Sequence, residues 1–371
     1  HRDLHSFPTR RSSDLSTGQK PSPACWPGFR GDTQLTGVGH AKADPPYTLR
    51  WTFRTGDAIK SSPVTCGKMI YCGSNDGFLY ALNLQGGLIW KYDAGNSIES
   101  PPVLVEDMVI AGTLEGTLFC LDGATGREIW SYQTEGQISG APNHLKRTDK
   151  TGINILAGSY DYFLHGVDGA TGAMKWKYET ENFINGTPAL FGKIAIFGGC
   201  DGHLHLVNGE TGTLIEKIDI TTYMASSPAV SGNRVYFGNY DGEFFCFDLR
   251  KKKMLWKTEG GGPFLSSPAV SGTRAVIGSQ NKTLYCYDTG SGKILWAFRA
   301  QGKLDASPVI SGNLVVVASS DGRLRMLNLE DGRERWSYDT GTPLYSTPSV
   351  TSAGIVVGGD DGHIFFFEKK M

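Results

Sequence analysis

The chain has 371 residues, with 36 Lys and Arg against 37 Asp and Glu, 49 glycines and 11% aromatic residues. The balanced charge argues against a nucleic-acid partner and against an acidic solvating tail. Charged residues make up only 20% of the chain, which excludes a disordered protein, and no apolar run reaches the roughly 18 residues that span a bilayer. Frequent glycine turns and aromatic strands favour an all-β protein.

The N-terminal stretch is expected to lie outside the fold. The chain starts at His1 rather than at a methionine, so we expect a fragment or a processed product. Its opening sequence, HRDLHSFPTRRSSDL, is polar and aperiodic and resembles translated sequencing-adapter read-through. We therefore expect residues 1–20 to be a non-native or disordered leader, 21–48 an extended lead-in and 49–371 the folded domain.

A unit of about 40 residues recurs through the folded domain. Each unit has a proline, then a turn of the Asp-Gly type such as Asp241-Gly242, then a tryptophan. The prolines are Pro63, Pro102, Pro142, Pro188, Pro228, Pro268, Pro308 and Pro348. The tryptophan slot holds Trp51, Trp90, Trp130, Trp176, Trp256, Trp296 and Trp336, and the fourth unit has Glu216 there.

Each unit predicts four short strands. Examples are 265–270, with its Ser-Pro pair, for the first strand and 235–238 for the second. The third strand is represented by 243–248 and the fourth, around the tryptophan, by 254–258. Asp-Gly between apolar runs is a strong hairpin signal. The run 314–318 is apolar on both faces, which predicts a sheet packed between two others. Because proline removes a ladder donor, the first strand should be an inner edge that lines a central channel.

The two ends of the repeat array predict a closed ring. The last unit stops after its third strand, and an orphan strand around Trp51, residues 49–53, precedes the first unit. If the orphan strand completes the last sheet, every sheet has four strands and no edge is left open. We predict an all-β, eight-bladed β-propeller of four-stranded antiparallel blades that functions as a monomer.

The tryptophans are predicted to have a structural role. An indole buries roughly 150–250 Å². One indole on each outer strand can cover the junction with the next blade, whereas stacking on a planar cofactor would require a position at the channel. The junction at Glu216 is therefore expected to be the weakest of the ring.

The repeat resembles a known family. The unit combines Ser-Ser-Pro, Val-Tyr-Phe-Gly and Asp-Gly with Leu-Asp-Gly-Ala-Thr-Gly-Arg-Glu-Ile-Trp at 121–130, and it resembles the PQQ-like propeller repeat with its tryptophan-docking motif over 49–370. The segment WPGFRGD at 26–32 is similar to the lead-in of many bacterial secreted PQQ-like propellers. The resemblance implies either a quinoprotein dehydrogenase that uses PQQ and calcium, or a non-catalytic propeller similar to BamB, a scaffold of outer-membrane β-barrel assembly.

The channel rim favours the non-catalytic class. The residues three before each proline are Lys60, Glu99, Ser139, Asn185, Ala225, Leu265, Asp305 and Tyr345, with a single cation for a tricarboxylate. Glu99, Asn185 and Asp305 suit calcium chemically but lie on separate blades. Adjacent cysteines, C-x-x-C-H and long insertions are all absent from the sequence. We predict no cofactor; PQQ and calcium belong only to the alternative.

Cysteines and histidines add little. Cys120, Cys246 and Cys286 share one repeat slot, which predicts small buried residues, and most of the seven cysteines are expected to be free thiols. Seven is an odd count for an oxidising compartment. His203 and His205 share one strand face and could hold a metal, but no third ligand is visible.

The sequence therefore predicts a BamB-like scaffold that binds a protein partner in the bacterial envelope, in the periplasm and associated with the outer membrane. Candidate contacts are the rim residues, the basic insertion with Lys146, Arg147 and Lys150, and the turn Lys251 to Lys253, although both basic loops can also be plain solvated turns. The alternatives are a quinoprotein that oxidises alcohols or sugars, and a sensor domain cut from a longer chain.

Overall fold

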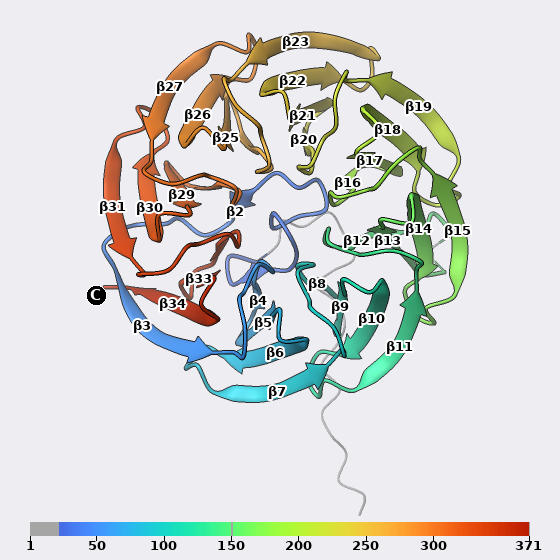
Figure 1. Cartoon of the computed structure of the whole chain (residues 1–371), viewed down its shortest axis with the longest axis horizontal. Helices are drawn as coiled ribbons and strands as arrows, with labels where there is room; N and C mark the ends of the chain where they lie inside the picture. Colours follow the sequence, from blue (N-terminus) through green and yellow to red (C-terminus); the bar gives the residue numbers. More distant parts are fainter. Residues whose placement is uncertain (1–21, 150, 371) are drawn as a thin grey trace, which may run out of the picture.

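The computed structural model describes residues 22–149 and 151–370, and the predicted leader 1–20 lies outside them. The described residues form strands and turns without a helix, and so contain no helix that could cross a membrane. The strands build eight sheets arranged around one axis (Figure 1). The prediction of an eight-bladed all-β propeller is confirmed.

Each blade runs from an inner strand at the axis to an outer strand at the rim. The inner strands are β4 (Val64–Cys66), β8 (Val103–Val105), β12 (Asn143–Lys146), β16 (Ala189–Phe191), β20 (Ala229–Ser231), β24 (Ala269–Ser271), β28 (Val309–Ser311) and β32 (Ser349–Val350). The second strands are β5 (Met69–Gly73), β9 (Met108–Gly112), β13 (Ile153–Gly158), β17 (Ile194–Gly198), β21 (Arg234–Gly238), β25 (Arg274–Gly278), β29 (Leu314–Ala318) and β33 (Ile355–Gly358).

The third strands follow the Asp-Gly turns, and the outer strands carry the tryptophan slot. The third strands are β6 (Phe78–Asn83), β10 (Thr117–Asp122), β14 (Phe163–Asp168), β18 (His203–Asn208), β22 (Glu243–Asp248), β26 (Thr283–Asp288), β30 (Arg323–Asn328) and β34 (His363–Lys369). The outer strands are β7 (Leu88–Asp93), β11 (Glu128–Gln133), β15 (Met174–Glu179), β19 (Leu214–Asp219), β23 (Lys253–Glu259), β27 (Ile294–Arg299), β31 (Glu334–Asp339) and β3 (Tyr47–Arg54).

The inner strands correct one prediction. The sequence placed the proline inside the first strand, as in 265–270, but β24 begins at Ala269, directly after Pro268. Proline has no N–H to give to a ladder, so pairing can begin only beyond it. By contrast β22 and β29 match their predicted bounds, and all five residues of β29 are buried.

The ring closes where the sequence predicts. The outer strand of blade eight is β3, which pairs antiparallel with β34 and places Trp51 opposite Phe366. Their rings stack with centroids 5.2 Å apart. On the axis side, the Thr347 N–H donates to Ser62 Oγ at 2.9 Å, which joins blade eight to blade one. The junction between the first and last parts of the ring therefore leaves no outer sheet edge unpaired.

The tryptophan slot links each blade to the next. The Trp130 indole, 7% exposed, packs on the turn of the following blade, and its Nε1–H donates to Gly169 O at 2.9 Å. A Cβ on Gly172 of that turn would lie 2.8 Å from the indole, so the contact requires glycine. The same indole-to-carbonyl bond recurs from Trp51 to Leu84, Trp90 to Gly123, Trp256 to Thr289 and Trp296 to Leu329.

The junction between blades four and five differs. Glu216 takes the indole position, and Lys252 stands where the other turns have their glycine, with a φ of 50°. Lys252 Nζ lies 2.7 Å from Glu216 Oε2, and the two side chains are 55% and 31% exposed. Exposed ion pairs contribute little to stability. That this junction is the weakest stays a prediction.

The lead-in crosses the axis and ties the blades together. Two short strands in it, β1 (Cys25–Trp26) and β2 (Val38–Gly39), pair with β4 and β28. Its carbonyl oxygens accept N–H bonds from the inner edges of seven blades, and Asn143 of the remaining blade donates its amide to Thr33 O. The lead-in therefore forms a plug at the centre of the ring (Figure 1).

Candidate binding face at the channel mouth

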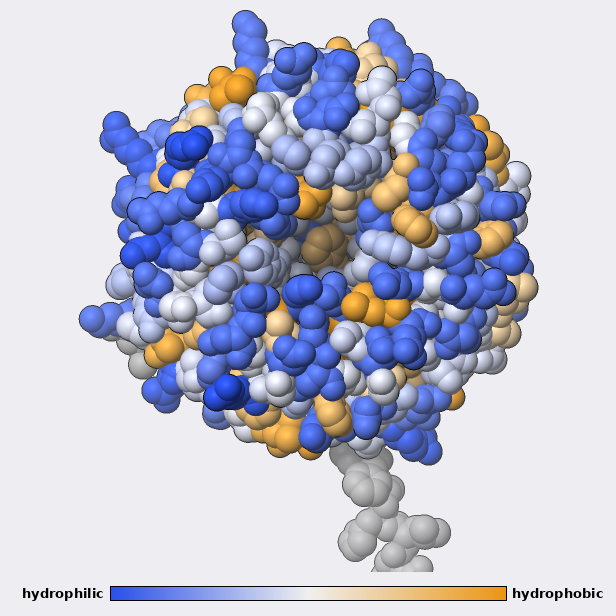
Figure 2. All heavy atoms as spheres, viewed as in Figure 1, coloured by the Kyte–Doolittle hydropathy of each residue, from blue (hydrophilic) through white to orange (hydrophobic). Residues whose placement is uncertain are grey.

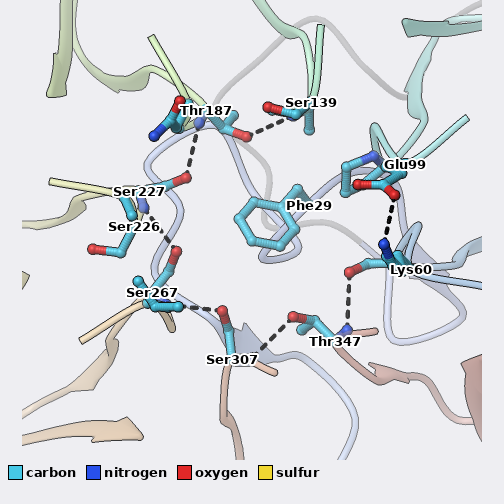
Figure 3. A pocket seen from close by; sticks show the side chains of 18 of the residues that line it. Phe29, Lys60, Glu99, Ser139, Thr187, Ser226, Ser227, Ser267, Ser307 and Thr347 are labelled. Carbon is cyan, nitrogen blue, oxygen red and sulfur yellow. Dashed lines mark hydrogen bonds and ion pairs between the residues drawn. The ribbon is translucent and has the colours of Figure 1, made fainter. Parts of the chain in front are cut away.

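Hydroxyl side chains form a chain of hydrogen bonds around the axis. In most blades the hydroxyl just before the recurring proline accepts an N–H from the preceding blade in the ring, as in Ser227 N–H to Ser267 Oγ at 2.9 Å. Six such bonds join seven blades (Figure 3), with the donors Ala141, Thr187, Ser227, Ser267, Ser307 and Thr347. These hydroxyls fix the positions of the rim residues beside them.

Blade two lacks this bond, because Pro101 occupies the hydroxyl position and has neither an N–H nor a hydroxyl. The serines two residues before the recurring proline in blades one and two make the missing connection. Ser61 Oγ donates to Ser100 O at 3.1 Å, and Ser100 Oγ donates to Gly140 O at 2.9 Å. The circle is thus completed with a different set of donors over blades one to three.

A blind pit opens inside this circle. Its cavity volume is about 170 Å³, and Phe29 of the lead-in lies among its lining residues, in the middle of the circle (Figure 3). The space-filling view shows the hollow at the centre of the face (Figure 2). All eight rim residues line the pit: Lys60, Glu99, Ser139, Asn185, Ala225, Leu265, Asp305 and Tyr345. Whether they contact a ligand stays a prediction.

The charged groups of the pit differ in whether they have a partner of opposite charge. Lys60 Nζ lies 2.9 Å from Glu99 Oε1, and the hydrogen bond to Glu99 raises the pKa of Lys60. Asn75 Nδ2 also donates to Glu99, at 3.2 Å. Asp305 has no cation within ion-pair distance among the described residues; its Oδ1 has no hydrogen-bond partner, and burial raises its pKa. The Asn185 amide donates to Cys200 Sγ at 3.2 Å.

Aromatic side chains cluster over blades three to five, where the Tyr160 side chain hydrogen-bonds with the rim residue Ser139. Tyr160 and Phe183 stack with centroids 4.7 Å apart, and Tyr223 and Tyr240 stack at 4.4 Å. Tyr162 packs against Phe183 at 5.3 Å. We call these five residues the aromatic arc. Tyr162, Phe183 and Tyr240 are 41%, 37% and 38% exposed, so the arc presents ring surface to solvent.

Tyr162 occupies a strained position. It takes the second place of the Asp-Gly turn, where most blades have glycine, and its φ is 75°. This left-handed conformation costs an L-residue roughly 1–2 kcal/mol. Lys282 occupies the same slot in blade six, with a φ of 72°, and provides a matched position away from the arc.

The histidines belong to a structural slot. His205 Nε2 lies 2.8 Å from Asp201 Oδ2, its Nδ1 lies 3.1 Å from Tyr178 Oη, and its side chain is 1% exposed. His203 Nδ1 instead faces the carbonyl of Asp201. The described residues contain no group of three His, Cys, Asp or Glu side chains that could hold a metal ion. The two histidines are therefore packed parts of the turn.

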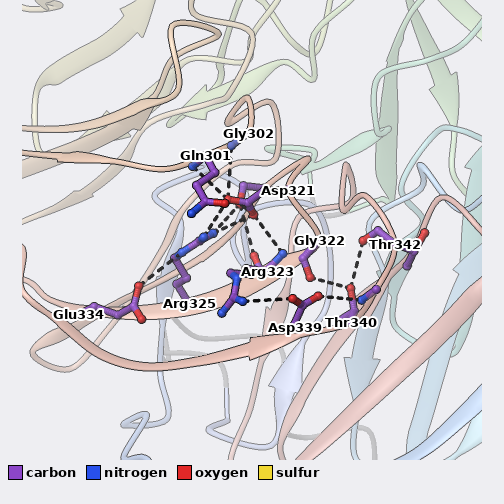
Figure 4. Close-up of polar contacts among 12 residues, drawn as sticks. Gln301, Gly302, Asp321, Gly322, Arg323, Arg325, Glu334, Asp339, Thr340 and Thr342 are labelled. Carbon is purple, nitrogen blue, oxygen red and sulfur yellow. Dashed lines mark hydrogen bonds and ion pairs between the residues drawn. The ribbon is translucent and has the colours of Figure 1, made fainter.

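The position of His205 on the third strand is taken by other side chains in other blades. In blade three it holds His165 with Asp161, and in blade seven Arg325, whose Nη2 lies 2.7 Å from Asp321 Oδ2 (Figure 4). Asp321 also accepts the N–H groups of Gln301 and Gly302 from the preceding interblade loop. Asp161, which accepts the Glu135 N–H, and Asp321 thus each connect a turn and a strand to the neighbouring blade.

Acid should weaken this slot. Burial alone would raise the pKa of Asp161, but the hydrogen bond and charge of His165 lower it to about 2. Because the pKa of Asp161 is lower in the folded protein than its ordinary value of 3.8, the ionised carboxylate stabilises the fold fully above about pH 3.8. This stabilisation is lost as the pH falls through about 2. We expect Asp161→Asn, which blade six already tolerates as Asn281, to cost about 2 kcal/mol at pH 7 and almost nothing below pH 2. Urea unfolding at a series of pH values tests this; a pH-independent difference would contradict it.

The cysteines follow the prediction in part. Cys120, Cys246 and Cys286 are buried free thiols on blades two, five and six, and Cys72 and Cys200 are free as well. Cys25 and Cys66, however, form a disulfide. The pair was missed because Cys25 lies outside the repeat, and only the path of the lead-in brings it opposite Cys66 in the β1–β4 pairing.

The two basic loops are largely engaged within the chain. Arg147 Nη2 lies 2.9 Å from Asp168 Oδ2, and the Thr148 N–H donates to Glu210 of blade four. Lys146 has an interaction, and Lys150 lies outside the described residues. Lys251 and Lys253 are exposed, while Lys252 pairs with Glu216.

A family profile described as Outer membrane protein assembly factor BamB matches residues 75–267 and 255–369. The chain belongs to this family of PQQ-like repeat propellers. A search of curated proteins found no match. The family assignment rests on the repeat itself, because the matched residues cover the ring from blade one to blade eight.

Solved structures of proteins from both functional classes resemble the fold of this chain. BamB from Moraxella catarrhalis has 20% identity and a TM-score of 0.73, covering 88% of this chain and 98% of its own. Quinohemoprotein alcohol dehydrogenase from Comamonas testosteroni has 14% identity and a TM-score of 0.80, with 95% and 82% covered. A europium-containing methanol dehydrogenase has 13% identity and a TM-score of 0.80, with 94% and 99% covered. At these identities the likeness concerns the fold alone.

The pit does not fit the cofactor of the quinoprotein class. Its one lysine is already paired with Glu99, whereas PQQ carries three carboxylates that need converging cations. The oxygen ligands Glu99, Asn185 and Asp305 come from blades two, four and seven. The cavity of about 170 Å³ is also smaller than the roughly 300–1,000 Å³ of ordinary cofactor pockets.

Proposed function

We propose that this propeller is a non-catalytic scaffold of the bacterial cell envelope that binds a protein partner through the pit face. The aromatic arc carries the proposal. Exposed tyrosine and phenylalanine rings are typical of the energetic centre of protein interfaces. Tyr162 belongs to this set, and it is 41% exposed.

An extracytoplasmic location is part of the proposal. The Cys25–Cys66 disulfide fits an oxidising compartment. The free thiols are compatible with it, since burial raises the pKa of Cys246 to about 11 and that of Cys286 to about 12 and so disfavours the reactive thiolates. The family description names an outer-membrane assembly factor, which supports association with the outer membrane. A single ring in the periplasm as the working unit is part of the proposal. Membrane fractionation of cells that carry the tagged chain tests the location.

The variant Tyr162→Gly should change partner binding and stability in opposite directions. Glycine relieves the left-handed φ, so we expect the free energy of unfolding to rise by about 0.5–1 kcal/mol. The same variant removes a ring of the arc, and we expect at least a fivefold loss of any partner captured from an envelope extract. Lys282→Gly is the matched control, with a similar gain in stability and no loss of capture. Equal capture by both variants would remove the arc from the proposed function.

A further inference from the structure

The chemistry of the pit indicates its own ligand, independent of the aromatic arc. Its centre is the Phe29 ring, seen face-on within the hydroxyl circle (Figure 3). The electron-rich face of an aromatic ring attracts cations. Tyr345 adds a second aromatic side chain to the wall, and hydroxyl and amide side chains supply half of the remaining lining.

The charges in the pit favour a positive ligand. Three lining residues are lysine, glutamate or aspartate: Lys60, Glu99 and Asp305. Lys60 and Glu99 pair with each other at 2.9 Å, and this contact holds the Lys60 ammonium at the wall, aside from Phe29 (Figure 3). The carboxylate of Asp305 has no ion-pair partner among the lining residues, although a hydrogen bond with Gln280 and the nearby charge of Lys303 favour its ionised form. A half-buried carboxylate of this kind is stabilised by an incoming cation.

Another cation lies near the floor. The Cζ of Arg30 is 6.0 Å from the Phe29 centroid, and its side chain is fully buried in the plug, where its Nη2 donates to Pro268 O at 3.0 Å. Asp32 is close enough to offset part of its charge. Arg30 therefore belongs to the plug, and the residues that line the open space above Phe29 carry one more carboxylate than ammonium.

We propose that the pit binds one organic cation of the alkylammonium or guanidinium type, over the Phe29 ring and beside Asp305. A volume of about 170 Å³ admits a group of this size and excludes a polycyclic ligand. The cation has two possible sources with the same chemistry, a free small amine or a Lys or Arg side chain presented by a bound protein. The first source is independent of the scaffold function, and the second deepens it.

Calorimetric titration of the full chain distinguishes the sources. The probes are agmatine for the free source, N-acetyl-arginine amide for the side-chain source, and N-acetyl-citrulline amide as the neutral isostere. We expect saturable one-to-one binding of at least one cation and at least tenfold weaker binding of citrulline. A preference for agmatine assigns a free amine, and a preference for the blocked arginine assigns a protein side chain.

Three variants test the position. Asp305→Asn should weaken the cation at least tenfold, whereas Asp241→Asn, which removes an exposed carboxylate outside the pit on the Asp-Gly turn of blade five, should leave the affinity unchanged. Lys60→Met removes the competing cation and frees Glu99, so it should tighten binding about fivefold. Failure of every cationic probe to bind, or binding that Asp305→Asn and Lys60→Met leave unaltered, would overturn the proposal. The gain expected from Lys60→Met cannot be produced by loss of fold.

Discussion

Trp130→Ala is expected to lower the free energy of unfolding by about 3–5 kcal/mol, as other buried tryptophan truncations do. The indole is 7% exposed, covers Gly172 of the next blade and donates to Gly169 O. Its removal therefore opens a cavity at a blade junction and leaves a buried carbonyl without its donor. Equilibrium unfolding in guanidinium, followed by intrinsic fluorescence and circular dichroism, measures the change.

The fourth outer strand provides the control. Glu216→Ala removes an exposed ion pair with Lys252 and should cost less than about 1 kcal/mol. The double variant Glu216→Trp with Lys252→Gly restores the pattern of the other junctions and should raise stability by at least about 1 kcal/mol. A cost for Glu216→Ala as large as that for Trp130→Ala would contradict the role assigned to the indole slot.

Loss of the Cys25–Cys66 disulfide should have a comparable effect. The bridge closes a sequence separation of 41 residues, and loop-closure entropy for that length corresponds to about 4 kcal/mol. It also fixes the start of the plug to blade one. We expect Cys25→Ala with Cys66→Ala to unfold at clearly lower denaturant concentration, and the wild-type chain to show the same shift after reduction.

Two controls isolate the bridge. Cys200→Ser alters a free, half-buried thiol and should leave the reductant-induced shift of the midpoint intact. In the double alanine variant, reductant should cause no additional shift. A wild-type midpoint that reductant leaves unchanged would mean that the plug is held by its carbonyl bonds to the inner strands alone.

The sequence was sufficient for the fold because the repeat encodes it several times over. The Asp-Gly turns predict the hairpins, the both-face apolar runs predict sheets packed between sheets, and Trp51 at one end matches an incomplete blade at the other. The error concerned the prolines, which precede the inner strands, because periodicity alone does not locate the first ladder bond.

The candidate site was only partly predictable. Counting back from the prolines located the eight rim positions, since every blade presents the same position to the axis. Phe29 and Cys25 lie in the lead-in, which has no repeat to compare with, and their places depend on backbone bonds to blades far along the chain. The aromatic arc was missed because its members occupy different slots on neighbouring blades. A signal existed in Asp161-Tyr162, where a bulky residue replaces the usual turn glycine.

We expect the pit face to bind partners and not to hold a quinone cofactor. Titration of the purified chain with PQQ in the presence of Ca²⁺ tests it most directly, followed by quinone absorbance and by dye reduction with alcohols and aldose sugars. The structure predicts no saturable quinone binding and no turnover, because the only lysine of the pit is already bound to Glu99. Saturable binding with substrate-dependent dye reduction would contradict the account.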